Sequence, residues 1–230
     1  MFSLSKTPNV IKLAAEHSPQ MKIVCVDGDV PEMMVMDYIG EDGWGGGVPA
    51  SEVIAFSRKH KGKDISVRFN SLGGSAFEGI VMHNALQEHD GKVTAYIDGV
   101  AFSAASFAAV GAGRIVMQAA SSFGIHRAGT IAIGNAKTFR GVTEWLDAID
   151  AHQVSIFANK TGKDEATVNS WLDGTDDGTL FSADEALAVG FADEVIPLAK
   201  RETVAAVKSI VAFARIAAEL KLKRMKAINS

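Results

Sequence analysis

Residues 65–75, ISVRFNSLGGS, and residues 93–106, VTAYIDGVAFSAAS, decide the fold of this chain. Each stretch begins with an apolar run typical of a strand, passes through glycine and reaches a serine at which a helical pattern begins. Strand and helix patterns that alternate in this way predict parallel strands joined by helices. The two stretches therefore predict an α/β fold.

The same alternation continues on both sides of these stretches. Apolar runs bounded by turn residues predict strands over residues 22–26, 33–39, 65–69, 93–97, 114–118, 123–126 and 192–196. Helical periodicity predicts helices over residues 49–59, 75–88, 103–110, 137–160, 164–171 and 183–189. No internal repeat or linker divides this region, so we expect residues 21–200 to form one domain.

The segments that flank this domain have different patterns. Residues 1–20 mix charged residues, prolines and short apolar runs, and we expect an N-terminal arm with a short helix over residues 10–17. Residues 201–230 are expected to form an amphipathic C-terminal helix with a basic end. Cations at that end complement the helix dipole, so we expect it to be solvated or in contact with another subunit.

Composition argues against several classes of protein. Of the 230 residues, 47% are apolar and 22% are charged, as in a globular domain and unlike a disordered or fibrous chain. A net charge of −4 argues against nucleic acid as a partner. The single cysteine, Cys25, excludes an internal disulfide and a cysteine-based metal cluster. We expect no cofactor and no metal. The sequence lacks a secretory signal and an apolar run long enough to span a membrane, which predicts a cytoplasmic protein.

The glycine turn at residues 70–75 is the first candidate for a catalytic element. Its paired glycines leave backbone N–H groups free at a helix N-terminus, a place that favours negative charge. The alternative is a tight turn in which Ser75 caps the following helix. No Gly-Lys-Ser/Thr follows, as a Walker loop would require, so phosphate binding is disfavoured.

Ser103 and His126 are the residue types of a nucleophile and its general base. Ser103 begins a helix of small residues, so its hydroxyl and the next backbone N–H can face one substrate carbonyl. His126 ends a predicted core strand, whereas the other five histidines fall in helix-like or polar surroundings. A serine nucleophile needs such a base within hydrogen-bond reach. The alternatives are a helix-capping serine and a buried histidine with a structural role.

Four motifs then follow one another along the chain: Asn70-Ser71-Leu72-Gly73-Gly74, Gly99-Val100-Ala101-Phe102-Ser103-Ala104, Gly124-Ile125-His126 and Phe181-Ser182-Ala183-Asp184-Glu185-Ala186. In order and spacing they resemble the Clp protease proteolytic-subunit family, most closely its phage branch, the Clp-like head maturation (prohead) proteases. The resemblance covers residues 22–196. It implies a ClpP/crotonase-like fold of repeated ββα units with a long handle helix, here over residues 137–160.

The resemblance also implies roles for individual residues. Ser103 is expected to be the nucleophile of a serine endopeptidase and His126 its general base. The backbone N–H groups of Gly73 and Ala104 are expected to form the oxyanion hole. Leu72 stands where the family usually has proline, a change that removes no catalytic group.

The third member of the catalytic triad is where this chain departs from the family. The family's acid lies four residues before the Ser-Ala-x-Glu-Ala helix, and that position is Gly178 here. A shift of one residue in this loop would supply Asp177, and Asp176 is the alternative. Both aspartates could instead be solvated loop residues, with His126 oriented by a carbonyl group or a water molecule.

The implied function is that of an ATP-independent or loosely regulated endopeptidase that cleaves phage scaffold and capsid proteins during head maturation. The implied assembly is a homo-oligomer, a heptameric ring or stacked rings, with residues 137–160 between the rings. A Clp-type ATPase could dock on such a ring, but the resemblance to the phage branch argues against this partner. One alternative is a catalytically weak or inactive ring with a structural role in assembly. The other is a crotonase-type acyl-CoA enzyme, against which the pair of Ser103 and His126 argues.

Overall fold

The computed structural model describes residues 25–26, 29–41, 46–175 and 178–198. In this part of the chain eight strands form one sheet in the order β1-β2-β3-β4-β5-β8, with β6 paired to β4 and β7 paired to β6. Only β1-β2 and β6-β7 pair antiparallel. The predicted α/β fold with a parallel sheet is confirmed. The strands are β1 (Cys25–Val26), β2 (Glu32–Val35), β3 (Ile65–Ser71), β4 (Val93–Phe102), β5 (Arg114–Gln118), β6 (Ser122–Ile125), β7 (Thr179–Ser182) and β8 (Glu194–Ile196).

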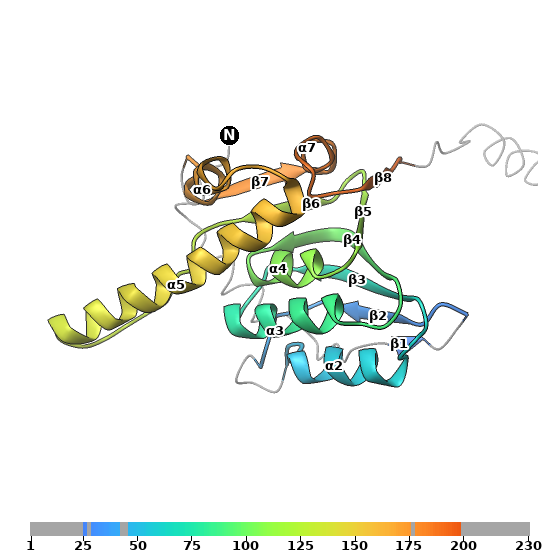
Figure 1. Cartoon of the computed structure of the whole chain (residues 1–230), viewed down its shortest axis with the longest axis horizontal. Helices are drawn as coiled ribbons and strands as arrows, with labels where there is room; N and C mark the ends of the chain where they lie inside the picture. The colour runs from blue at the N-terminus through green and yellow to red at the C-terminus, as the bar shows by residue number, and fades with distance from the viewer. Residues whose placement is uncertain (1–24, 27–28, 42–45, 176–177, 199–230) are drawn as a thin grey trace, which may run out of the picture. The chain divides into compact units, whose positions relative to one another are not determined.

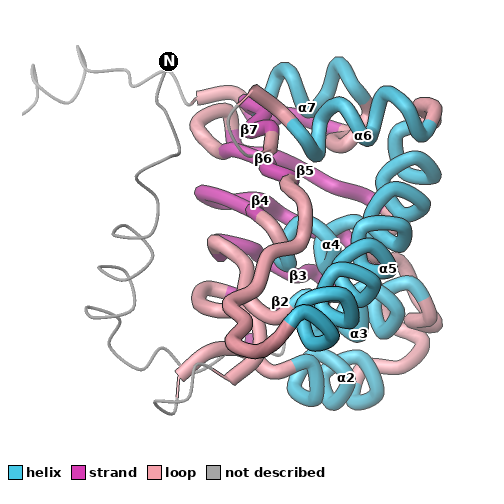
Figure 2. The backbone as a smooth tube through the Cα atoms, turned by 90° about the vertical axis from the view of Figure 1, so that its left-hand side faces the viewer, coloured by secondary structure: helices cyan, strands magenta, loops and turns pink. Residues whose placement is uncertain are grey.

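Helices connect the parallel strands, and α2, α3, α4 and α5 lie along one face of the sheet (Figure 2). The first three of them each follow one strand and precede the next, as the alternating sequence pattern predicts. The bounds of all six described helices are α2 (Ala50–Lys59), α3 (Ala76–Gln87), α4 (Ala104–Val110), α5 (Ala136–Thr161), α6 (Glu165–Asp173) and α7 (Ala183–Val189).

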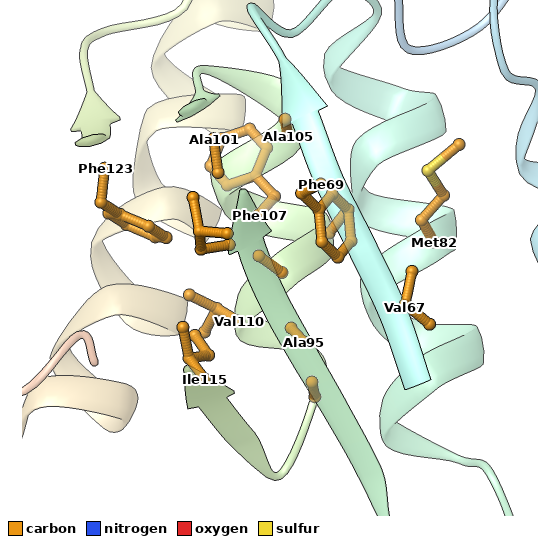
Figure 3. Close-up of a cluster of buried hydrophobic side chains, with 14 of the residues drawn as sticks. Val67, Phe69, Met82, Ala95, Ala101, Ala105, Phe107, Val110, Ile115 and Phe123 are labelled. Carbon is orange, nitrogen blue, oxygen red and sulfur yellow. The ribbon is translucent and has the colours of Figure 1, made fainter. Parts of the chain in front are cut away.

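The core lies between this face of the sheet and the helices. Alternate residues of the strands point toward the helices and are almost completely buried, since one face of a strand receives every second side chain. The apolar side chains drawn in Figure 3 come from β3, β4, β5 and β6 on one side and from α3 and α4 on the other, among them Val67, Phe69, Met82, Phe107, Ile115 and Phe123.

Strand β4 is longer than the strand predicted over residues 93–97. Its first half pairs with β5, and its last three residues pair with β6, where Phe102 lies opposite Gly124. This second ladder extends the strand to the residue before Ser103. Strand β7, which the sequence patterns did not predict, pairs antiparallel with the other side of β6, so that Thr179 lies opposite Ile125.

Strand β2 is shorter than the strand predicted over residues 33–39, because it ends at Val35. Ile39 instead forms isolated bridges with Val48 and Gly74. The backbone of Ile39 donates to the carbonyl of Gly73 (2.9 Å) and accepts from the N–H of Ser75 (2.8 Å). These two bonds attach the glycine turn after β3 to the chain that follows β2.

Helix α5 is 26 residues long, and only its C-terminal half belongs to the core. Its N-terminus is capped by Asn135, whose Oδ1 accepts from the backbone N–H groups of Lys137 and Thr138. Buried residues begin at Ile149, and the first half extends away from the sheet (Figure 1).

The predicted N-terminal arm, and the C-terminal helix expected within residues 201–230, lie outside the described residues. Among the residues that are described, no helix is long and apolar enough to cross a membrane.

Candidate active site

Ser103 stands between the end of β4 and the start of α4 in a strained backbone conformation. Its φ of 57° and ψ of −126° make it the only non-glycine residue with positive φ in the described part of the chain. Such a conformation costs about 1–3 kcal/mol and persists only where surrounding bonds hold it. Here the N–H of Ser103 donates to the carbonyl of Gly124 (3.1 Å), and its carbonyl accepts from the N–H (2.9 Å) and Oγ (2.6 Å) of Ser106.

His126 follows the last residue of β6, and its imidazole lies beside the Ser103 side chain. Nε2 of His126 is 2.7 Å from Oγ of Ser103. The two residues are brought together because the end of β4 pairs with β6, so that the two strand ends lie side by side. A hydroxyl in contact with an imidazole nitrogen is the arrangement from which a histidine can remove the hydroxyl proton.

Phe102 packs against one face of the His126 ring. The two rings stack with centroids 4.8 Å apart and an interplanar angle of 19°. Gly124 on the neighbouring strand leaves the space for this aromatic ring: a Cβ atom there would lie 2.2 Å from Cδ2 of Phe102. Sequence reasoning did not single out Phe102, and its only signal was an aromatic residue directly before the candidate serine.

The glycine turn after β3 lies directly against the Ser103 backbone. A Cβ atom at Gly73 would be 2.7 Å from Cβ of Ser103 and 2.9 Å from the backbone nitrogen of Ala104, and its φ is +98°. Only glycine fits both the conformation and the space. The N–H of Gly73 donates to Oγ of Ser71 (3.1 Å), and that hydroxyl donates to the carbonyl of Asp37 (2.5 Å).

The two candidate acids, Asp176 and Asp177, lie outside the described residues, but both neighbours of that segment are described. Gly178 lies against the end of β6, since a Cβ atom there would be 2.3 Å from the carbonyl oxygen of Ile125 and 2.4 Å from Cβ of His126. Gly174 and Gly178 form an isolated bridge. The loop that contains both aspartates therefore begins and ends at paired backbone positions, one of them in contact with His126.

The described residues contain no group of three or more His, Cys, Asp and Glu side chains arranged to hold a metal ion. The contact between Ser103 and His126 can support the chemistry of an activated hydroxyl. Ser103 supplies the oxygen, His126 can accept its proton, and Ala104 begins α4, where backbone N–H groups have no acceptor within the helix.

Comparisons with known proteins agree with this fold. The family model described as Clp protease matches residues 49–199, more than half of the chain. Among solved structures, a point mutant of ClpP1 from Listeria monocytogenes is similar, with a TM-score of 0.62 and 16% sequence identity. The similarity covers 73% of this chain and 92% of the Listeria protein. At this identity the solved structure supports the fold, and the family match covers the strands and turns that carry Ser103 and His126.

Proposed function

Because the chain belongs to the Clp protease family, whose members are peptidases, we propose that it is a serine endopeptidase in which Ser103 is the nucleophile and His126 the general base. The observation that carries the proposal is the 2.7 Å contact between Oγ of Ser103 and Nε2 of His126. The strained backbone of Ser103 supports it further, since such strain is concentrated at functional sites.

In the proposed reaction, Oγ of Ser103 attacks the carbonyl carbon of the scissile peptide bond while Nε2 of His126 takes the hydroxyl proton. His126 then gives this proton to the leaving amine as the C–N bond breaks, which leaves an acyl group on Ser103. A water molecule, deprotonated by His126, attacks the acyl carbon; the bond between this carbon and Oγ of Ser103 then breaks, and His126 returns the proton to Oγ as the second product leaves. The protein returns to its starting protonation state without a cofactor.

We propose the backbone N–H groups of Gly73 and Ala104 as the donors that stabilise the oxyanion. Each such donor is worth about 3 kcal/mol of transition-state stabilisation. The close approach of Gly73 to the backbone of Ser103 and Ala104 supports this assignment. Since the N–H of Gly73 donates to Oγ of Ser71, the developing oxyanion would replace that hydroxyl as its acceptor.

For the acid that orients His126 we propose Asp177, with Asp176 as the alternative. The contact between Gly178 and His126 supports a position for one of them near the imidazole, because Gly178 directly follows Asp177. In a Ser-His-Asp triad, loss of the acid lowers kcat by about 10⁴. Asp177→Asn is therefore expected to lower the rate strongly, and Asp176→Asn is its matched control.

The experiment that tests the nucleophile is labelling with a fluorophosphonate probe followed by peptide mass mapping. We expect label on Ser103 in the wild type and in Ser75→Ala, whose hydroxyl caps α3, and no label on that peptide in Ser103→Ala. A folded and assembled wild type that takes no label would contradict the proposal. It would favour the alternative of a catalytically inactive ring with a structural role.

We further propose that the substrates are phage scaffold and capsid proteins in the bacterial cytoplasm, and that cleavage needs no ATPase. This step rests on the resemblance of the four sequence motifs to the prohead proteases. The test is to incubate the purified protein, without ATP, with a phage scaffold protein and with casein, and to map the products by mass spectrometry. Cleavage of casein alone would contradict the substrate assignment while leaving the peptidase proposal intact.

We also propose a homo-oligomeric ring, either one heptamer or stacked heptamers. Support comes from apolar side chains on and before the projecting half of α5: Ile131 and Ile133 are 97% and 94% exposed, and Phe139 and Trp145 about half exposed. A concentration of exposed apolar surface of this kind indicates a protein partner. Ile131→Glu combined with Ile133→Glu is expected to produce smaller species in sedimentation velocity; an unchanged distribution would exclude this surface as the contact.

A further inference from the structure

Arg127 directly follows His126, and its side chain joins two helices to the catalytic strand end. Its Nε donates to Oδ1 of Asp173 (2.6 Å) and its Nη2 to Oδ1 of Asn169 (2.9 Å), both on α6. Its Nη1 donates to Oδ2 of Asp150 on α5 (3.3 Å). A planar guanidinium can serve three acceptors in fixed directions, whereas a lysine ammonium cannot reproduce that geometry.

The contact with α5 is reinforced by the backbone. Asp150 has only 12% of its side chain exposed, and its Oδ1 accepts from the N–H of Ala128 (2.8 Å) and from Nε2 of Gln153 (3.1 Å). One carboxylate therefore binds both the side chain of Arg127 and the peptide unit after it. The two residues that follow His126 are held to the buried half of α5.

The contact with α6 leads back to His126. Asp173 is the last residue of α6, and its carbonyl accepts from the N–H of Gly178 (3.3 Å). Gly178 in turn lies against His126, because a Cβ atom there would be 2.4 Å from Cβ of the histidine. A ring of contacts thus connects four residues. A covalent bond joins His126 to Arg127, hydrogen bonds join Arg127 to Asp173 and Asp173 to Gly178, and Gly178 packs against His126. The guanidinium also holds the pKa of Asp173 below its usual value, so this carboxylate is charged at neutral pH.

We propose that Arg127 is a positioning residue of the peptidase: it fixes the backbone of His126 against α5 and α6, so that the imidazole stays within reach of Ser103. This inference rests on the proposed function, since it assigns a role toward the proposed base. Arg127 takes no part in proton transfer. Its effect is on the fraction of molecules in which the nucleophile and the base are aligned, and a misplacement of about 1 Å at such a pair can cost about 10²-fold in rate.

The test uses the variants Arg127→Gln, Arg127→Lys and Asp173→Asn. The control is Arg114→Gln, which removes an arginine of β5 that pairs with the carboxylate of Glu194. The fluorophosphonate labelling of Ser103 is resolved into a maximal rate and a half-saturation concentration. We expect Arg127→Gln to lower the maximal rate at least tenfold with the half-saturation concentration within twofold, and Arg127→Lys to recover only part of it. Arg114→Gln should label like the wild type. Because 59% of the Asp173 side chain is exposed, we expect Asp173→Asn to stay folded and to lose labelling rate in the same direction as Arg127→Gln.

A second readout does not depend on activity. Hydrogen exchange of the paired backbones of β6 and β7 should accelerate in Arg127→Gln and in Asp173→Asn but not in Arg114→Gln, since Ile125 and Thr179 pair at the end nearest Arg127. Unchanged exchange and an unchanged maximal rate would overturn the inference. So would a rate loss in Arg127→Gln that Arg127→Lys restores completely, because charge alone would then suffice. A wild type that does not label, with exchange still accelerated in the variants, would refute the peptidase proposal while retaining the role of Arg127 in holding His126.

Discussion

The aromatic ring of Phe102 stacks on the imidazole of His126, with the ring centroids 4.8 Å apart. Nε2 of the same imidazole contacts Oγ of Ser103. Phe102 and Ser103 are adjacent in the chain, so one short segment at the end of β4 supplies both the proposed nucleophile and the surface against which the proposed base packs. A histidine ring packed in this way has little freedom to rotate away from the hydroxyl.

Replacing Phe102 tests whether this stack matters for reactivity. An aromatic pair is worth about 0.5–1.5 kcal/mol beyond its buried area, which corresponds to a factor of about two to ten in rate. We expect Phe102→Leu to label Ser103 more slowly by this factor with little loss of stability. The measurement is the rate of fluorophosphonate labelling, with Leu180→Ala as control because Leu180 is exposed and approaches the same glycine. Equal rates for Phe102→Leu and the wild type would show that the stack is incidental.

Gly124 is predicted to be intolerant of any side chain. The added methyl group of Gly124→Ala would lie 2.2 Å from Cδ2 of Phe102 and 2.8 Å from Cδ1 of Leu180, so both side chains must move. Overpacking of this kind costs about 1–3 kcal/mol of stability, and displacement of Phe102 should also slow labelling of Ser103.

The matched control is Gly141→Ala in α5, where an added Cβ atom meets nothing within 4 Å. Because glycine is unfavourable within a helix, this variant should be more stable by up to about 1 kcal/mol. Chemical denaturation of both variants measures the two effects. A Gly124→Ala protein as stable as the wild type would mean that Phe102 has room to move.

Ser71 is expected to stabilise the glycine turn through its hydroxyl. Its side chain is buried and accepts from the N–H of Gly73 while it donates to the carbonyl of Asp37. Ser71→Ala removes the acceptor of a buried N–H, at a cost of about 1–3 kcal/mol in the free energy of unfolding.

Ser121→Ala serves as the control, since Oγ of Ser121 donates only to the carbonyl of Gln118, which also accepts from the N–H of Ser121. Its loss should cost less than the loss of the Ser71 hydroxyl. Urea titrations of the two variants measure their free energies of unfolding. Equal losses of unfolding free energy in Ser71→Ala and Ser121→Ala would contradict a special role for Ser71.

His83 is predicted to make stability depend on pH. Burial lowers the pKa of this imidazole below the usual 6.5, although its hydrogen bond with the carbonyl of Phe107 acts in the opposite direction. The unfolded chain therefore binds a proton at a higher pH than the folded chain does. The free energy of unfolding should fall as pH drops below about 6.5, by up to about 1.4 kcal/mol per pH unit, and level off below the folded pKa.

The measurement is the free energy of unfolding between pH 5 and pH 8 in the wild type and in His83→Asn. The difference between the two proteins should shrink as the pH falls, because the variant lacks the group that resists protonation. A difference that stays constant over this range would contradict the assignment to His83.

Several elements follow from local sequence alone. The bounds of β5 and α7 are those predicted. The signal for β5 is an apolar run between turn residues, and the signal for α7 is a helical pattern between Ser182 and Gly190. Each signal lies within one segment of the sequence. The capping box of Ser182 and Glu185 is one such signal. Ser103 and His126 were likewise singled out from the ends of their own strands, and their catalytic roles stay predictions. The acid was narrowed to Asp177 or Asp176 and stays a prediction.

Contacts between distant segments were decided only by the tertiary structure. Strand β4 continues to Phe102 because β6 lies beside it, and β7 forms because it pairs with the other edge of β6. The residues of β4 and β7 alone do not indicate which strand each will pair with. The same holds for Phe102 against His126 and for Arg127 against Asp173, which is 46 residues away in the chain. The sequence by itself determined the α/β order and the two candidate site residues, since periodicity and turn chemistry act over a few residues. The tertiary structure decided their 2.7 Å contact and its supports, because these depend on which strands and helices pack together.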